Sequence, residues 1–311
     1  MIIESITKDE YLEILNNNNI ATPIYADQEA IDIYSNKEII KVVKNDCTLA
    51  VFLVPIDNNG IRREYRFFPY VNPIFINNEN NYSKKKILKK IFNYLFNKYD
   101  YCFIPLHPSF KMISAIQSEG GFVEMRHTHV TDKIISLDNV PAKLRNHIRN
   151  ALKQVDVVIG RDYKDYDFNL AIKGDKDEII KRSNLTKKLI DNGKGLVIKG
   201  VVDGKVNAGI ICIYDNDWGY LLHSYQDKTI RGIIPLLILK ANEYLFDEIG
   251  IEYFDFEGSV IDEIDDFFSS FNVNIVNYPY IIESKSKNKF YGLISRSMNI
   301  EGRINEYESD K

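Results

Sequence analysis

The chain has 311 residues, which is more than one small core needs and suits two domains of about 150 residues each. Hydrophobic residues make up 45% and charged residues 27%, as is ordinary for a globular protein. The net charge of −4 argues against a dedicated DNA-binding or RNA-binding protein, because such proteins are usually basic.

The start of the chain and its apolar runs bear on cellular location. Residues 1–10 lack the basic start and the apolar stretch of a signal peptide. The apolar run at 233–239 is far shorter than the ~20 residues that span a bilayer. The cysteines lack CxxC spacing and lie in strand-like runs, which indicates reduced core thiols at Cys47, Cys102 and Cys212. We therefore expect a cytoplasmic protein without a membrane span.

The first half begins with two runs rich in β-branched and aromatic residues, at 48–55 and 63–69, on either side of a turn. A long helix follows, and a strand begins at Tyr101. A second turn, a helical stretch and another strand, at Phe122, complete this half.

The second half repeats this order of elements. Runs at 206–214 and 218–225 flank a turn, a long helix follows, and a strand begins at Ile251. The tripeptide Tyr-Leu-Phe occurs at 94–96 and again at 244–246, 150 positions later, each time just before the strand. A shared motif within a shared order of elements predicts an internal duplication.

The junction between the halves falls near residues 136–140, before a helix that Pro141 opens. We predict an α/β protein with mixed sheets, divided into an N-terminal domain at 1–137 and a C-terminal domain at 138–285. The polar tail at 286–311 is expected to be frayed.

The helix after Pro141 has a cationic stripe formed by Arg145, Arg149 and Lys153, one helical turn apart. Like charges at this spacing destabilise a helix, so the stripe suggests an anionic neighbour such as a bound substrate. The alternatives are a solvated face and pairing with acidic residues from elsewhere in the chain.

The strand at 218–225 leads through Gln226 and Arg231 into an apolar helix that starts after Gly232. Free backbone amides at this helix start, with Arg231 beside them, could hold a phosphate or a carboxylate. An ordinary strand-to-helix turn explains the same residues equally well.

The strand from Ile251 carries two carboxylates near its end. Strand alternation predicts that Asp255 and Glu257 share one face, opposite Phe254 and Phe256. Repulsion between the carboxylates and partial burial would raise the pKa of one of them, as a general base requires. Alternatively, one or both cap the following helix or face water.

His127 and His129 share a strand face, but no third metal ligand occurs at a recognisable spacing. We therefore expect no metal site, and a structural role for both histidines.

Several segments together resemble the FemABX-like acyltransferases of the GNAT superfamily, which carry two GNAT-like domains in tandem. In the second half these segments are 144–151, 194–214, the turn before Gly232, the run Phe254-Asp255-Phe256-Glu257-Gly258-Ser259, and 266–272. In the first half they are Thr22-Pro23, 49–55, 69–73 and Gly121-Phe122. The resemblance covers nearly the whole chain.

The resemblance implies transfer of an aminoacyl group from charged tRNA, or of an acyl group from a coenzyme A thioester, to an amine. Two departures from the family pattern are visible. The segment 226–232 has a single glycine where acetyl-CoA-dependent members have a glycine-rich pyrophosphate loop. Phe268 stands where the cell-wall aminoacyl transferases tend to have a lysine.

We accordingly predict an N-acyltransferase whose donor carbonyl lies between the strands that end at Tyr225 and Asp255. The acceptor would be an amine on a small molecule or a cell-envelope precursor, and the donor acyl-CoA or aminoacyl-tRNA, with no tightly bound cofactor. The assigned residues are Asp255 or Glu257 as the base, with His223 in reserve; Gln226, Arg231 and Gly232 for the donor; and Tyr70, Arg145, Arg149 and Tyr225 for the substrate. The alternative is a catalytically silent binding module that keeps the fold for recognition alone.

Overall fold

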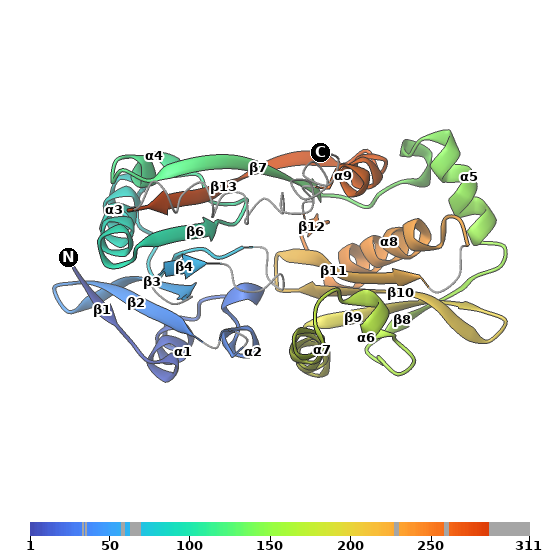
Figure 1. Cartoon of the computed structure of the whole chain (residues 1–311), viewed down its shortest axis with the longest axis horizontal. Coiled ribbons are helices and arrows are strands. Elements are labelled where there is room, and N and C mark those ends of the chain that lie inside the picture. Colours follow the sequence, from blue (N-terminus) through green and yellow to red (C-terminus); the bar gives the residue numbers. More distant parts are fainter. Residues whose placement is uncertain are drawn as a thin grey trace, which may run out of the picture. The chain divides into compact units, whose positions relative to one another are not determined.

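The computed structural model describes residues 1–32, 34, 36–56, 60–62, 70–226, 230–257 and 261–285 (Figure 1). The chain forms two compact units. Unit 1 comprises residues 1–20, 36–126 and, among the described residues, 278–285; unit 2 comprises 21–35 and 127–277. The predicted tail at 286–311 lies outside the described residues.

Unit 1 has one four-stranded antiparallel sheet and a second group of strands around β6. The first sheet has the order β1 (Ile2–Ser5), β2 (Lys37–Lys44), β3 (Cys47–Pro55), β5 (Ile74–Phe75). β6 (Tyr101–Pro105) lies between β4 (Gly60–Arg62), which is parallel to it, and the antiparallel β13 (Asn274–Ser284). The helices are α1 (Lys8–Asn17), α3 (Asn81–Lys98) and α4 (Ile113–Gln117).

Unit 2 is built on strands in the order β12 (Tyr253–Asp255), β11 (Trp218–Gln226), β10 (Lys205–Tyr214), β9 (Gly195–Val202), β8 (Asp156–Gly160). Beside β12 runs the end of β7 (Phe122–Thr131). Figure 1 shows α7 (Lys176–Asp191) and α8 (Ile233–Tyr244) on opposite faces of these strands. The remaining elements are η1 (Ile24–Ala26), α2 (Gln28–Ile31), η2 (Leu137–Asn139), α5 (Ala142–Ala151), α6 (Phe168–Ala171), the π-helical turn η3 (Leu245–Ile249) and α9 (Asp262–Ser269).

Burial of apolar side chains explains why these elements form. The buried side of α8 includes Leu236 and Leu237, which belong to one core cluster with Ile210 and Cys212 of β10. Cys212 and Cys102 are buried thiols as predicted, whereas Cys47, at the start of β3, is exposed. No helix within the described ranges is both long and apolar enough to cross a lipid bilayer.

The predicted domain boundary, between residues 137 and 138, does not coincide with the division into compact units. The difference lies in the strands that close each half. β7, expected to close the first half, pairs through Val130 and Thr131 with β12 of the second half. β13, expected to close the second half, pairs with β6 of the first half. Backbone ladders of this kind bind each closing strand to its partner strand. Domains contiguous in sequence therefore do not match the compact units.

Residues 21–35 also join unit 2, although they precede the predicted junction. The Lys194 ammonium donates to the Asp27 carboxylate, and the Asn192 amide donates to Glu29 Oε1 at 2.6 Å. The backbone N–H of Ile24 donates to Asp215 Oδ2 at 2.9 Å. Polar contacts with residues far along the chain thus hold this segment in unit 2.

The strands after the two Tyr-Leu-Phe motifs occupy equivalent positions, as the repeat predicts. β6 lies between a parallel and an antiparallel strand, and β12 lies between the parallel β11 and the antiparallel β7. The sequence of buried and exposed positions over 91–98 is the same over 241–248. In each half an antiparallel strand pair, β2–β3 or β9–β10, comes before these elements.

A buried carboxylate ties β2 to α3 in unit 1. The side chain of Glu38 is 5% exposed, and it accepts hydrogen bonds from Lys98, Tyr99, Tyr94 and Ser5. Burial by itself would raise the pKa of Glu38, but these hydrogen bonds together hold it below its ordinary value.

We expect Glu38→Gln to reduce the free energy of unfolding at pH 7 by about 1.5–3 kcal/mol, because each lost bond involves a charged acceptor. The folded pKa is lowered, so the carboxylate stabilises the fold above its ordinary pKa of 4.5, and this contribution is lost as the pH falls through the folded pKa. Urea unfolding of both proteins between pH 7 and pH 3, at unit intervals, measures this. Glu10→Gln is the control, since Glu10 pairs with Lys41 at a side chain 40% exposed and should cost under about 1 kcal/mol. Equal losses in the two variants would contradict the assignment.

Candidate active site

The two parallel strands β11 and β12 are paired over a short stretch only. Their register joins residues 218–220 of β11 to residues 253–255 of β12. β12 ends there, whereas β11 continues to Gln226 and stays paired with β10 on its other side. Beyond Tyr220, the edge of β11 that pairs with β12 therefore forms no further ladder pairs with that strand. A strand edge of this kind can pair with an extended ligand.

A β-bulge in β11 decides which side chains gather at this point. The neighbouring residues Ile211 and Cys212 of β10 pair with His223 and Leu221, which makes Leu222 the extra residue. The bulge shifts the alternation of side chains by one position.

The partners of Tyr220, His223 and Tyr225 on β10 are two residues apart from one another, so they point to the same face of the sheet. The three residues of β11 therefore share that face, although the bulge makes their own spacing uneven. Asp255 is the partner of Tyr220 in the parallel ladder and shares that face. Asp255, His223 and Tyr225 from the predicted set thus share one face of the sheet.

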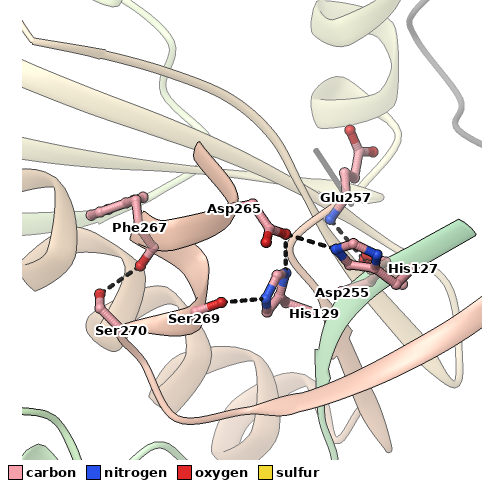
Figure 2. Close-up of polar contacts among 9 residues, drawn as sticks. His127, His129, Asp255, Glu257, Asp265, Phe267, Ser269 and Ser270 are labelled. Atoms are coloured by element: carbon pink, nitrogen blue, oxygen red, sulfur yellow. Dashed lines mark hydrogen bonds and ion pairs between the residues drawn. The ribbon is translucent and has the colours of Figure 1, made fainter. Parts of the chain in front are cut away.

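Asp255 is fully buried and is held by two hydrogen bonds to the same oxygen. The Thr128 hydroxyl donates to Asp255 Oδ1 at 2.5 Å. The backbone N–H of Glu257 donates to the same oxygen at 2.7 Å (Figure 2). On the other side of the turn, the N–H of Phe256 donates to the carbonyl of His129 at 2.9 Å. The carboxylate thus fixes the end of β12 against β7.

The prediction that Asp255 and Glu257 project from one strand face is wrong. β12 ends at Asp255, and Glu257 has a φ of +56°, in the left-handed region. An aspartate that accepts a hydrogen bond from the backbone two residues later forms a turn, which ends the strand. The half-buried Glu257 carboxylate consequently points away from His127 and His129 (Figure 2).

His223 is buried, and burial, reinforced by nearby Arg182, lowers its pKa to about 3. Its ring is therefore neutral near pH 7 and binds a proton weakly. Tyr225 is buried too; its ring meets the edge of Tyr166 at 4.8 Å between centroids, and its hydroxyl donates to the carbonyl of Asp165 at 3.3 Å.

A cavity of about 490 Å³ lies beside Tyr166, between α6 and α7. Phe168 and Ser183 line it, together with the charged residues Asp165, Asp167 and Lys187. The hydroxyl of Tyr166 is buried, and the described part of the chain provides no hydrogen-bond partner for it. The cavity is therefore open to a polar ligand and lies next to the face that carries Tyr225.

Of the predicted donor residues, Arg231 and Gly232 directly precede α8, and Gln226 is the last residue of β11. Gly232 has a φ of +90°, and a Cβ atom there would come within 2.4 Å of the His147 backbone, so close packing of α5 requires a glycine. The N–H of Ile233 donates to the Ile230 carbonyl at 3.2 Å, and Pro235 has no N–H. Among the first three helical residues, at most Ile234 can offer an amide to an anion. Arg231 and Gln226 are exposed.

The cationic stripe on α5 has an acidic neighbour within unit 2. Arg145 and Arg149 approach Asp138 Oδ1 at 3.5 and 3.8 Å. In this structure both arginines therefore pair with an acidic residue of the chain, which is one of the alternatives given above. Tyr70 belongs to unit 1, is 1% exposed, and packs its ring against His107 and Tyr278.

Two residues far along the chain contact the histidines of β7. His127 Nε2 lies 2.9 Å from Asp265 Oδ1, and His129 Nε2 lies 3.1 Å from Ser269 Oγ (Figure 2). Sequence reasoning missed these partners and Thr128, because a contact between residues about 140 positions apart leaves no local pattern. Within the described ranges, no group of three or more His, Cys, Asp or Glu residues is placed to hold a metal ion.

We expect Thr128→Val to reduce the free energy of unfolding by about 1.5–3 kcal/mol, because it keeps the shape of the side chain but removes a donor from a buried carboxylate. Thr131→Val is the matched control on the same strand, since that buried hydroxyl donates to a neutral carbonyl, that of Lys133, at 2.7 Å. The control should lose about 0.5–1.5 kcal/mol. Urea unfolding measures both; a smaller loss for Thr128→Val than for Thr131→Val would refute the role of the hydroxyl.

No protein-family model and no curated protein matches the chain. Solved structures match over nearly its full length. FemX has a TM-score of 0.62 at 13% identity, covering 94% of this chain and 100% of its own. L-PGS from Bacillus licheniformis has a TM-score of 0.58 at 13% identity, with 95% and 98% covered.

A tandem GNAT protein from the clavulanic acid biosynthesis pathway has a TM-score of 0.53 at 9% identity, covering 90% of this chain and 97% of its own. At these identities the matches concern the fold. They agree with the mixed α/β architecture and with the resemblance found in the sequence. The chain therefore has a FemABX- and GNAT-like fold.

Proposed function

We propose that the chain transfers an acyl or aminoacyl group from an activated donor to an amine, at the point in unit 2 where β11 and β12 separate. The observation that carries the proposal is the short parallel ladder that ends at Tyr220 and Asp255, while β11 continues to Gln226. An extended donor can pair with the open side of β11. Its reactive carbonyl would then lie near the turn after β12.

Glu257 is the better candidate for the general base, and Asp255 for a positioning residue. Asp255 is fully buried, and its Oδ1 already accepts two hydrogen bonds. Glu257 is half-buried, directly follows the turn, and is held there through its own backbone N–H. His223, with a pKa of about 3, would take up a proton least readily of the three near pH 7.

The reaction would begin when Glu257 removes a proton from the ammonium group of the acceptor. The amine nitrogen then bonds to the donor carbonyl carbon, and the bond from that carbon to the sulfur or oxygen of the leaving group breaks. As the amide forms, the nitrogen loses its second proton and the leaving group takes up a proton, while Glu257 releases the first proton to solvent. Backbone N–H groups on the open side of β11 are candidates to stabilise the oxyanion.

The cavity beside Tyr166 is the proposed entry for the amine. Asp165 and Asp167 would attract an ammonium group, and the Tyr166 hydroxyl would bind a polar part of the acceptor. Such an acceptor is a small molecule or a cell-envelope precursor, and a cytoplasmic location suits both proposed donors. Substrate binding by Tyr70, Arg145 and Arg149 stays a prediction.

The start of α8 favours an aminoacyl-tRNA donor over acyl-CoA, because it offers few amides for a pyrophosphate. The same observation would suit a catalytically silent binding module. Among coenzyme donors, acetyl-CoA is the first to test, because the matching structure of the tandem GNAT protein is the form named as being without AcCoA.

Thermal unfolding with acetyl-CoA, longer acyl-CoAs and nucleotides should reveal a coenzyme donor. A ligand at 100 times its Kd stabilises a protein by about 2.7 kcal/mol, which corresponds to a shift of several degrees. Given the sparse amides of α8, we expect no such shift, and transfer of a labelled amino acid from charged tRNA to an amine instead. A clear shift with acyl-CoA would overturn the preference for tRNA. Absence of both signals would support the silent module.

We expect Glu257→Gln to fold normally and to lower the transfer rate by about 10²-fold or more, because it removes the base and keeps the shape. The rate is measured under single-turnover conditions with donor bound. Glu252→Gln is the control, since Glu252 is exposed just before β12, and its rate should stay unchanged. Near-normal transfer by Glu257→Gln would show that the amine loses its proton to water or to the substrate itself.

A further inference from the structure

Ser269, His129 and Asp265 are arranged in line on the face of the unit 2 sheet opposite Asp255. Asp265 and Ser269 lie one turn apart on α9 and both face β7. The imidazole of His129 lies between them, with Nε2 at 3.1 Å from Ser269 Oγ and Nδ1 at 3.8 Å from Asp265 Oδ1 (Figure 2). Val130 shares a face with Asp255, so His129 faces the other side.

The three side chains differ in exposure in a way that suits a nucleophile and its base. The His129 side chain is 0% exposed and packs against the ring of Phe268, with the ring centroids 5.9 Å apart. The Asp265 side chain is 32% exposed, and Ser269 is exposed. The hydroxyl can thus be reached from solvent, while the imidazole behind it is shielded.

The position of the carboxylate decides which nitrogen of His129 carries the proton. Burial lowers the pKa of His129, although Asp265 acts in the opposite direction, so the ring is neutral near pH 7. Its Nδ1 is buried, and within the described residues Asp265 is the acidic group that lies closest to it. A proton on Nδ1 is attracted to the carboxylate, whereas a lone pair there would be repelled. Nε2 therefore accepts, and the Ser269 hydroxyl donates to it.

The contacts around this line support that orientation. Asp265 is held in place by His127, whose Nε2 lies 2.9 Å from Oδ1. The neighbouring Ser270 behaves as serines at helix ends usually do, since its hydroxyl donates to the Phe267 carbonyl of its own helix at 2.5 Å. Ser269 instead directs its hydroxyl to a histidine of another element.

We propose that Ser269 is a nucleophile that accepts acyl groups from activated esters and thioesters, with His129 as its general base and Asp265 as the residue that orients His129. In this step Ser269 Oγ bonds to the acyl carbon as its proton passes to His129 Nε2. The bond from the acyl carbon to the leaving oxygen or sulfur breaks, and the leaving group receives that proton. The product is an acyl ester of Ser269. The arrangement is the one that activates serine in hydrolytic triads.

The test uses the full-length protein with a fluorophosphonate probe and, separately, with p-nitrophenyl acetate. Mass spectrometry of peptides should find the phosphonyl or acetyl group on Ser269. Ser269→Ala should remove this adduct, and His129→Gln should slow labelling by about 10²-fold or more. Asp265→Asn should slow it by roughly tenfold or more, because the orientation of the imidazole is lost. Ser270→Ala, the matched control, should label at the normal rate.

Two results would overturn the proposal. One is the absence of an adduct on Ser269 in the native protein, or an equal adduct in protein unfolded by urea. The other is an unchanged labelling rate in both His129→Gln and Asp265→Asn. Since Asp265 is partly exposed, Asp265→Asn keeps the test valid if the buried His129 variant fails to fold. Glu257→Gln should label normally, which separates this reactivity from the proposed transfer to amines.

Discussion

The buried carboxylate of Asp255 is the contact on which the candidate site depends. A buried charge is costly unless it is hydrogen-bonded, and this one is satisfied by Thr128 of β7 and by the N–H of Glu257. These bonds end β12, start a turn with a left-handed residue, and fix the turn to β7. Because β12 ends early, the parallel ladder between β11 and β12 stops at Tyr220, while β11 stays paired with β10 as far as Gln226. A charge whose partners come from two segments thus defines the opening in the sheet.

The exchange of closing strands makes this contact possible. Thr128 belongs to β7, which comes before the junction between the halves, yet it bonds a residue of the second half. In unit 1, β13 takes the corresponding place beside β6. β6 and β12 are therefore each flanked on one side by a strand from the other half of the chain. We infer that the halves depend on one another to fold, because neither has all its ladder partners within its own stretch of sequence.

The two histidine environments of unit 2 illustrate how burial divides chemical roles. His223 and His129 are both buried, and desolvation lowers the pKa of each. The cationic Arg182 lowers the pKa of His223 further, whereas Asp265 beside His129 acts against the lowering. His129 has a carboxylate, that of Asp265, to orient it and a hydroxyl, that of Ser269, to activate. The same residue type is thus poorly suited to catalysis at one position and well suited at the other.

The amino-acid sequence predicts the order of the elements, the repeat and the mixed α/β class, because these follow from local periodicity, turn residues and a recurring motif. It also singled out Asp255, His223 and Tyr225 as candidate site residues, which stays a prediction. It could not show the turn at Glu257, the pairing of Arg145 and Arg149 with Asp138, or the partners of His129. These depend on hydrogen bonds and ion pairs between side chains, and mostly on segments far apart in the chain, which only the tertiary structure brings within reach. The exchange of closing strands could not be predicted from the sequence either, because alternating residues specify that a segment forms a strand but not which strand pairs with it.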